Sequence, residues 1–261
     1  MAQTEQKKHE SSESGILVIT QSKPHTANCW SCGAMRAAHF CQECGKVQPP
    51  LPADYFSFFG LPYKLNLEPS KLEREFYGLS RHLHPDINAV SSQDEQRWSL
   101  EKSSQLNDAY RTLKDPITRT EYLLRLQGVH LEEQSKAATE EARRTGKAKQ
   151  QVVPADLLEQ VFELNMQLEE ARMNKKMGEP DRNLERELQD TKTHLQAKYD
   201  GMMVELHAAW NEWDALVDRA QQGGTVLEDD RLAVRDKMVE VLNRRNYLRN
   251  LLRDVDDVLQ G

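Results

Sequence analysis

The sequence predicts an all-α fold in which a helical hairpin follows a small cysteine-rich module and precedes a C-terminal three-helix bundle. Charged residues make up 30% of the 261 residues and apolar residues only 38%, a balance that suits long helices with narrow apolar stripes. The whole chain contains only 12 Gly and 10 Pro, the residues that most often interrupt helices. No stretch approaches the roughly 18 consecutive apolar residues of a membrane span, so no membrane partner is expected.

Composition divides the chain into five segments. These are a polar tail over 1–24, a segment over 25–48 that holds all four cysteines, a mixture of turn signals and helical periodicity over 54–128, a linker or loop without large apolar side chains over 132–150, and a strongly helical part over 151–261. Pro49, Pro50 and Pro52 form a stiff connector after the cysteines. The C-terminal helices are expected to break at Gly178 and at Gly223.

Net charge and the N-terminus narrow the class of protein. The formal charge of −7 disfavours a nucleic-acid partner, because duplex binding needs a basic face. Residues 1–13 contain three Glu and lack both the apolar run of a secretory signal and the Arg-rich composition of a transit peptide. A cytoplasmic protein is therefore expected. The mitochondrial matrix is the alternative for a chain whose targeting segment has been removed.

The cysteines occur in two short turns, each closed by a glycine: Cys29, Cys32 and Gly33, then Cys41, Cys44 and Gly45. The two-residue spacing lets both sulfurs of a turn face one ion, and four thiolates are the set that Zn²⁺ takes in structural sites. A structural Zn²⁺ ion held by these four cysteines is therefore expected, with no coordination position left for a substrate. The alternatives are a redox-active pair, an iron cluster, and reduced thiols without metal.

Two helices of matching apolar periodicity flank the tripeptide His84-Pro85-Asp86. The first begins at Pro69 and must stop at His84, because Pro85 disfavours a helical conformation in the preceding residue. The second ends near Lys114, and its candidate N-caps are Ser91, Ser92 and Asp94. By itself the tripeptide is a common turn, in which His84 would only cap a helix. No nucleophile stands near it in sequence to complete an enzymatic site.

This arrangement resembles a J-domain. The resemblance covers residues 54–117 and rests on Tyr55-Phe56, Phe59-Gly60-Leu61, His84-Pro85-Asp86, the stretch 106–113 and Asp115-Pro116. In that family the tripeptide stimulates ATP hydrolysis by a DnaK-type chaperone, and the basic face of the preceding helix docks on it. The resemblance implies a chaperone-binding set of His84, Pro85, Asp86, Lys71, Arg74, Arg81 and His82. Ile87 departs from the Lys that many J-domains carry.

Beyond residue 117 the chain resembles the HscB-type co-chaperones of iron–sulfur cluster biogenesis, which join a J-domain to a C-terminal helical bundle. Residues 118–131, with the run Glu121-Tyr122-Leu123-Leu124, and residues 157–164 carry this resemblance. It implies a protein that brings an IscU-type cluster scaffold to a DnaK/HscA-type ATPase chaperone and has no active site of its own. Some members of the family also have an N-terminal tetracysteine module.

The first helix of the bundle, expected to begin at Pro154, carries two apolar stripes. One stripe, which suffices to pack the helix, consists of Leu157, Val161, Leu164 and Leu168 within about 60° of one another. Leu158, Phe162 and Met166 form the second, about 140° away, which is either core or a patch that receives another protein. The resemblance implies the patch, with a scaffold-binding set of Leu158, Glu159, Phe162, Glu163, Met166 and Tyr247.

The last two helices have apolar seams typical of a bundle. The seam residues are Met202, Leu206, Ala209, Trp213 and Leu216, followed by Val234, Met238, Val241, Leu248, Leu252, Val255 and Leu259. Short breaks between the helices favour an intramolecular bundle over a homodimeric coiled coil, which remains the alternative. Three other functions stay open: a general J-domain co-chaperone for unfolded chains, a purely structural helical protein, and a thiol oxidoreductase.

Overall fold

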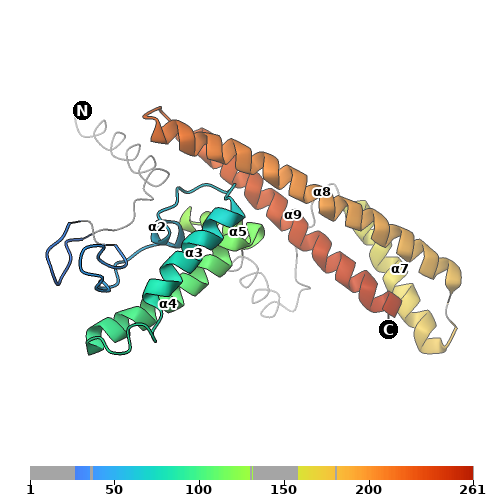
Figure 1. Cartoon of the computed structure of the whole chain (residues 1–261). Helices are drawn as coiled ribbons and strands as arrows, with labels where there is room; N and C mark the ends of the chain where they lie inside the picture. Colours follow the sequence, from blue (N-terminus) through green and yellow to red (C-terminus); the bar gives the residue numbers. More distant parts are fainter. Residues whose placement is uncertain (1–26, 36–37, 130, 132–157, 180, 261) are drawn as a thin grey trace, which may run out of the picture. The chain divides into compact units, whose positions relative to one another are not determined.

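The computed structural model describes residues 27–35, 38–129, 131, 158–179 and 181–260, and it confirms the all-α fold class. Those ranges contain seven helices (Figure 1), arranged in two compact units. The predicted tail over 1–24, the linker over 132–150 and the helix start at Pro154 lie outside the described residues. Among the helices of these ranges, none combines the length and the apolar character that a bilayer span requires.

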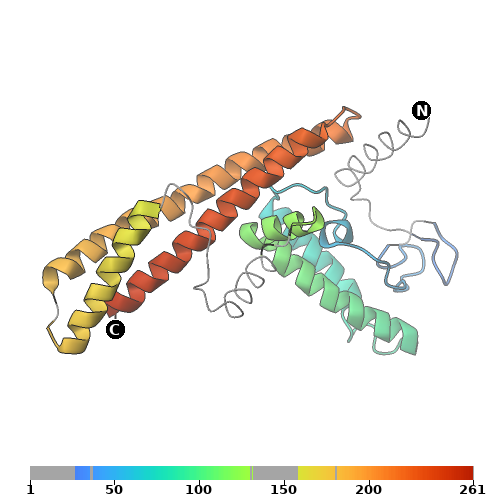
Figure 2. The same ribbon diagram turned by 180° about the vertical axis from the view of Figure 1, so that it is seen from behind.

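The first unit combines the described residues up to Gln127 with the segment Trp210–Ala233. Its own helices are α2 (Tyr55–Phe58), α3 (Pro69–Leu83), α4 (Gln93–Lys114) and α5 (Pro116–Leu126). Helices α3 and α4 lie side by side as an antiparallel hairpin (Figures 1 and 2), as the sequence predicts. Phe76 of α3 stacks on Tyr110 of α4 with ring centroids 4.1 Å apart.

The ends of the hairpin helices follow from local chemistry. Helix α3 begins at Pro69 and ends at Leu83, and His84 is extended (φ −65°, ψ 131°), as the proline after it requires. Ser92 is the N-cap of α4, and it forms a capping box with Glu95. The predicted ends of both helices are therefore confirmed, and the three candidate caps reduce to Ser92.

Helix α8 (Arg182–Gln221) contributes its last turns to the first unit. Trp213 donates a hydrogen bond from Nε1 to the carbonyl oxygen of Tyr63 at 2.8 Å. The Asp214 carboxylate accepts from the backbone N–H groups of Leu65 at 2.7 Å and Asn66 at 3.0 Å. Trp213 is 0% exposed, which confirms it as a core residue of the predicted seam, and Trp210 is 1% exposed. These contacts fix the loop between α2 and α3.

In the second unit α7 (Leu158–Met177) lies beside parts of α8 and α9 (Glu228–Gln260), as Figure 2 shows. Val161, Leu164 and Leu168 of α7 are buried, which confirms the predicted packing stripe as far as it is described. Buried residues of the predicted seams include Met202, Leu206, Ala209, Met238, Val241, Leu248, Leu252 and Val255. The predicted breaks are confirmed: α7 and α8 each end just before a glycine with positive φ, Gly178 at 77° and Gly223 at 79°.

Candidate functional site

The His84-Pro85-Asp86 tripeptide opens the loop between α3 and α4, and its polar side chains face solvent. The His84 and Asp86 side chains are 51% and 88% exposed. The backbone N–H of Asp86 donates to His84 Nδ1 at 3.2 Å. Nδ1 therefore accepts, so the neutral ring carries its proton on Nε2. The loop thus offers an imidazole and a carboxylate to a partner.

Two buried side chains that the sequence did not single out hold this loop in shape. Asn88 Nδ2 donates to the carbonyl oxygens of His82 and His84, both at 3.0 Å, and lies 3.2 Å from Ser99 Oγ. Ser99 Oγ donates in turn to the carbonyl oxygen of Leu83 at 2.8 Å. Asn88 and Ser99 are 8% and 0% exposed. The only available signal was an Asn in a turn, a common residue there, so periodicity could not assign it this task.

The basic candidates lie on one side of α3. Lys71, Arg74, Arg81 and His82 are all exposed, and at 100° per residue they span an arc of about 100°. The ring of His82 stacks on Phe40, with centroids 4.2 Å apart and an interplanar angle of 22°. The first three side chains are thus open to a partner, whereas His82 also contacts the cysteine-rich segment.

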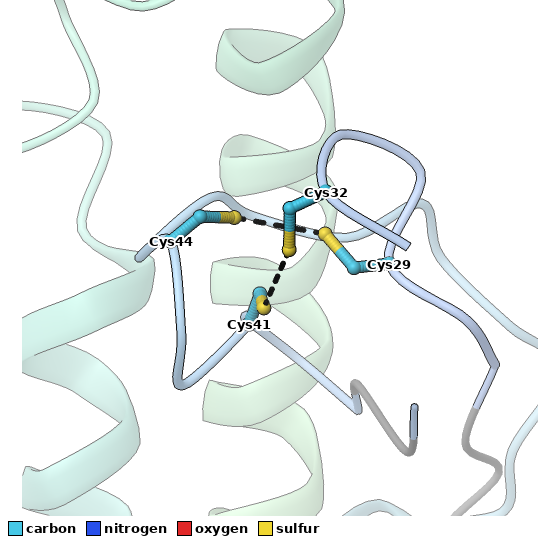
Figure 3. A group of neighbouring side chains, drawn as sticks. All are labelled: Cys29, Cys32, Cys41 and Cys44. Carbon is cyan, nitrogen blue, oxygen red and sulfur yellow. Dashed lines mark hydrogen bonds between the residues drawn. The ribbon is translucent and has the colours of Figure 1, made fainter. Parts of the chain in front are cut away.

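The four cysteine sulfurs point toward one another between the two turns (Figure 3). The Sγ atoms of Cys29 and Cys44 are 3.6 Å apart, as are those of Cys32 and Cys41, and all four lie within 4.8 Å of one another. Four sulfurs around one Zn²⁺ at about 2.3 Å would be about 3.8 Å apart. The donor set therefore fits a tetrahedral ion.

Backbone geometry repeats between the two turns. The N–H of Gly33 donates to the carbonyl oxygen of Cys29 and that of Gly45 to Cys41, both at 2.9 Å. Both glycines have positive φ, 75° and 73°, a conformation that side-chain-bearing residues rarely adopt. The predicted role of glycine in closing each turn is therefore confirmed.

Thiol ionisation in the cluster also favours a cation. Burial raises the pKa of Cys29, but hydrogen bonds at the backbone of Cys32 and Ser31 outweigh it and lower the pKa to about 6. For Cys32 a backbone hydrogen bond at Ala34 lowers the pKa, yet burial and the neighbouring thiols raise it to about 12. A thiolate at Cys29 is therefore supported by the protein itself, whereas a thiolate at Cys32 needs a positive charge beside it.

The second stripe of α7 is an exposed patch. Leu158, Phe162 and Met166 are 54%, 70% and 61% exposed, which decides against the core alternative. Glu163 is exposed beside them, and the side chain of Glu159 lies outside the described part of the chain. Tyr247, the sixth residue of the implied scaffold-binding set, is 8% exposed within the second unit. We refer to Leu158, Phe162 and Met166 as the α7 patch.

Comparisons with known proteins bear on these sites. No protein-family model matches the chain. A mouse protein named iron–sulfur cluster co-chaperone protein HscB is 40% identical over 111 residues, which are 40% of this chain and 47% of that protein. A co-chaperone protein HscB homolog from Vibrio cholerae strain M66-2 is 32% identical over 171 residues, 65% of this chain and 88% of that protein. The chain belongs to the HscB co-chaperone family.

The fold agrees with HscB membership. The crystal structure of human co-chaperone protein HscB superposes with a TM-score of 0.52 at 23% identity, covering 88% of this chain and 97% of that one. The alignments with the mouse and Arabidopsis thaliana HscB proteins span about half the length of those relatives, 47% and 43%. The residues implied for the chaperone lie in the first unit of this HscB protein, and those implied for the scaffold lie in the second.

Proposed function

We propose that this HscB-family protein is a co-chaperone that stimulates ATP hydrolysis by a DnaK/HscA-type chaperone. The observation that carries the proposal is the exposed His84-Pro85-Asp86 loop, which buried hydrogen bonds from Asn88 hold at the tip of a helical hairpin. A loop held in one shape loses little backbone entropy on binding, so less of the energy of its side-chain contacts is offset by ordering the loop.

The chaperone hydrolyses ATP, and this protein acts on the chaperone only by binding to it. The imidazole of His84 and the carboxylate of Asp86 meet the chaperone, while the basic side of α3 is attracted to an acidic surface on it. Stimulation follows if these contacts are stronger in the hydrolysing conformation of the chaperone than in its resting one. No group of this chain enters the reaction, so the protein is an activator and not an enzyme.

The α7 patch is proposed to receive an IscU-type iron–sulfur cluster scaffold. Leu158, Phe162 and Met166 lie one turn apart on one helix, so a partner can bury all three at once. A protein that holds the scaffold on one unit and the chaperone on the other raises the effective concentration of each for the other. The proposed function is therefore cluster assembly or transfer, and not the general binding of unfolded chains.

The tetracysteine cluster is proposed to hold a structural Zn²⁺ ion through Cys29, Cys32, Cys41 and Cys44. The spacing of the four sulfurs and the lowered pKa of Cys29 support this ion. With four thiolate ligands the ion has no open position, so it supplies folding energy rather than catalysis. A redox function would instead require the cysteines to cycle between thiol and disulfide.

The decisive experiment is single-turnover ATP hydrolysis by a DnaK/HscA-type chaperone, with and without an IscU-type scaffold. We expect the wild-type chain to accelerate hydrolysis and His84→Gln to abolish the acceleration while its helical circular dichroism stays unchanged. Val90→Ala is the matched control, because Val90 is 98% exposed in the same loop. Full acceleration by His84→Gln would overturn the proposed mechanism.

Scaffold binding has its own test in Phe162→Ala. A central aromatic anchor carries more than about 1.4 kcal/mol, so scaffold affinity should fall at least about tenfold. Val204→Ala, 72% exposed on α8, should leave the affinity unchanged. Equal affinities for the two variants would reject the α7 patch and favour a general co-chaperone for unfolded chains.

A further inference from the structure

The tetracysteine segment is not a separate appendage, because its polar groups are bonded to the hairpin. Lys46 Nζ pairs with the buried carboxylate of Glu95 on α4 at 2.9 Å. Lys102 of α4, only 3% exposed, donates from Nζ to the carbonyl oxygen of His39 at 3.2 Å. His39 Nε2 in turn donates to the carbonyl oxygen of Phe58 at 2.7 Å. Three hydrogen-bonded links therefore join the segment to α2 and α4.

Apolar contacts reinforce these links. Val47 is 1% exposed and belongs to the same core cluster as Phe58, Leu83 and Leu106. The rings of Trp30 and Trp98 meet edge to face at 5.7 Å. Because aromatic pairs and buried aliphatic side chains contribute cooperatively to a core, this segment folds as part of the hairpin's own core.

The contacts fall on both sides of the His84-Pro85-Asp86 loop. Phe40 stacks on His82, two residues before the loop, and Lys46 binds Glu95 in the first turn of the helix that follows it. Glu95 is also half of the capping box that starts α4. The segment thus contacts the end of α3 and the beginning of α4, the two helix ends that the loop connects.

We propose that the tetracysteine module, described over residues 27–35 and 38–48, is a brace that holds the chaperone-docking loop in its displayed shape. Binding of the ion orders the two cysteine turns. Phe40, which lies between the turns, then fixes the end of α3, and Lys46, which follows the second turn, fixes the beginning of α4. The effect of the brace on chaperone binding rests on the proposed function, but the existence of the brace does not. By linkage, an ion that stabilises the braced loop strengthens chaperone binding, and the chaperone strengthens ion binding by the same factor.

The brace also gives the ion a role that needs no contact with a partner. Ion loss would release Phe40 and Lys46 from the hairpin. His82 would then lose its stacked partner and Glu95 its cation, although the capping box within α4 would remain. The loop would fluctuate more, and the fraction of molecules ready to bind the chaperone would fall.

The test is hydrogen–deuterium exchange of the full-length protein at the amides of residues 87–96, measured with zinc bound and after chelation. Phe40→Ala and Lys46→Ala keep all four cysteines and probe the brace without removing the ion. We expect one zinc per chain in both variants and exchange about three- to tenfold faster than in wild type, as the loss of one ring stack, or of the cation that pairs with the buried Glu95 carboxylate, implies. Chelation should have at least as large an effect.

Met35→Ala is the matched control, because Met35 lies in the same module and is 81% exposed. It should exchange at the wild-type rate. Unchanged exchange at residues 87–96 in both variants and after chelation would overturn the brace. A wild-type chain that exchanges as expected but fails to stimulate the chaperone would reject the proposed function and leave the brace standing, so the two failures are distinguishable.

Discussion

Asn88 offers the sharpest test of how the loop between α3 and α4 is held. Its amide nitrogen has two protons and three acceptors within 3.2 Å: the carbonyl oxygens of His82 and His84, and Ser99 Oγ. Asn88→Ala removes the donor, and Asn88→Asp keeps the size of the side chain but replaces the donor by a second oxygen. Both variants break the same bonds.

The size of the effect follows from the bonds that are lost. Each net hydrogen bond is worth about 1 kcal/mol, so two carbonyl oxygens that lose their donor correspond to about 2 kcal/mol. In a chain of this size that amounts to a fall of about 4–8 °C in Tm. Asn88→Asp should be worse than Asn88→Ala, because it sets a carboxylate against two carbonyl oxygens in a site only 8% exposed.

Thermal unfolding followed by circular dichroism measures the stability, and single-turnover ATP hydrolysis by the chaperone measures the function. We expect both variants to keep the helical content of wild type at 25 °C but to stimulate hydrolysis less. Val90→Ala in the same loop is the control and should behave as wild type. If the Tm of Asn88→Ala lies within about 1 °C of that control, Asn88 does not hold the loop and the reasoning is refuted.

Three further predictions concern other parts of the first unit. Burial raises the pKa of Glu95, but hydrogen bonds from Lys46 and Ser92 lower it more, to below its ordinary value of 4.5. The stability that Glu95 contributes is therefore complete above pH 4.5 and is lost as the pH falls below it. In Glu95→Gln the free energy of unfolding in urea should consequently fall less than in wild type between about pH 5 and pH 3. Asp214→Asn should lower the free energy of unfolding by about 2–3 kcal/mol in urea titrations, since Leu65 and Asn66 donate to different carboxylate oxygens and the NH2 group that replaces one of them cannot accept; an unchanged midpoint would contradict this. In Gly45→Ala the new methyl group has open space around it, but the φ of 73° is unfavourable for alanine by about 1 kcal/mol. Competition with a chelator should show zinc binding weakened by that free energy, and an unaltered affinity would count against the turn geometry.

The helix ends and the packing stripes were accessible from sequence because local rules determine them. Pro85 stops α3 at Leu83, and Ser92 caps α4, through interactions that reach no more than four residues along the chain. Periodicity likewise identifies Val161 and Leu164 as buried without knowledge of their partners. The cysteine cluster was equally accessible, because the short spacing of each pair is itself the geometric condition for sharing an ion.

Contacts between distant segments were not accessible in this way. Glu95 and Lys102 lie on α4 among charged residues and suggest a solvated face, yet they are 2% and 3% exposed beneath the tetracysteine module. Their partners Lys46 and His39 stand 49 and 63 residues away in sequence. Periodicity assigns a polar residue to the surface by default, so a polar residue buried by a long-range hydrogen bond escapes it.

The α7 patch shows where a sequence pattern narrows the choice without making it. A helix in a three-helix bundle needs one apolar face, and Val161, Leu164 and Leu168 already provide it. The surplus stripe could have been covered by another helix, and only the arrangement of α7, α8 and α9 reveals that it is open. A bare Phe162 forgoes about 2 kcal/mol that burial of its side chain would contribute. Folding alone gives no reason to keep three such residues one turn apart on the surface, so a binding partner that buries them is the simplest physical account of the stripe.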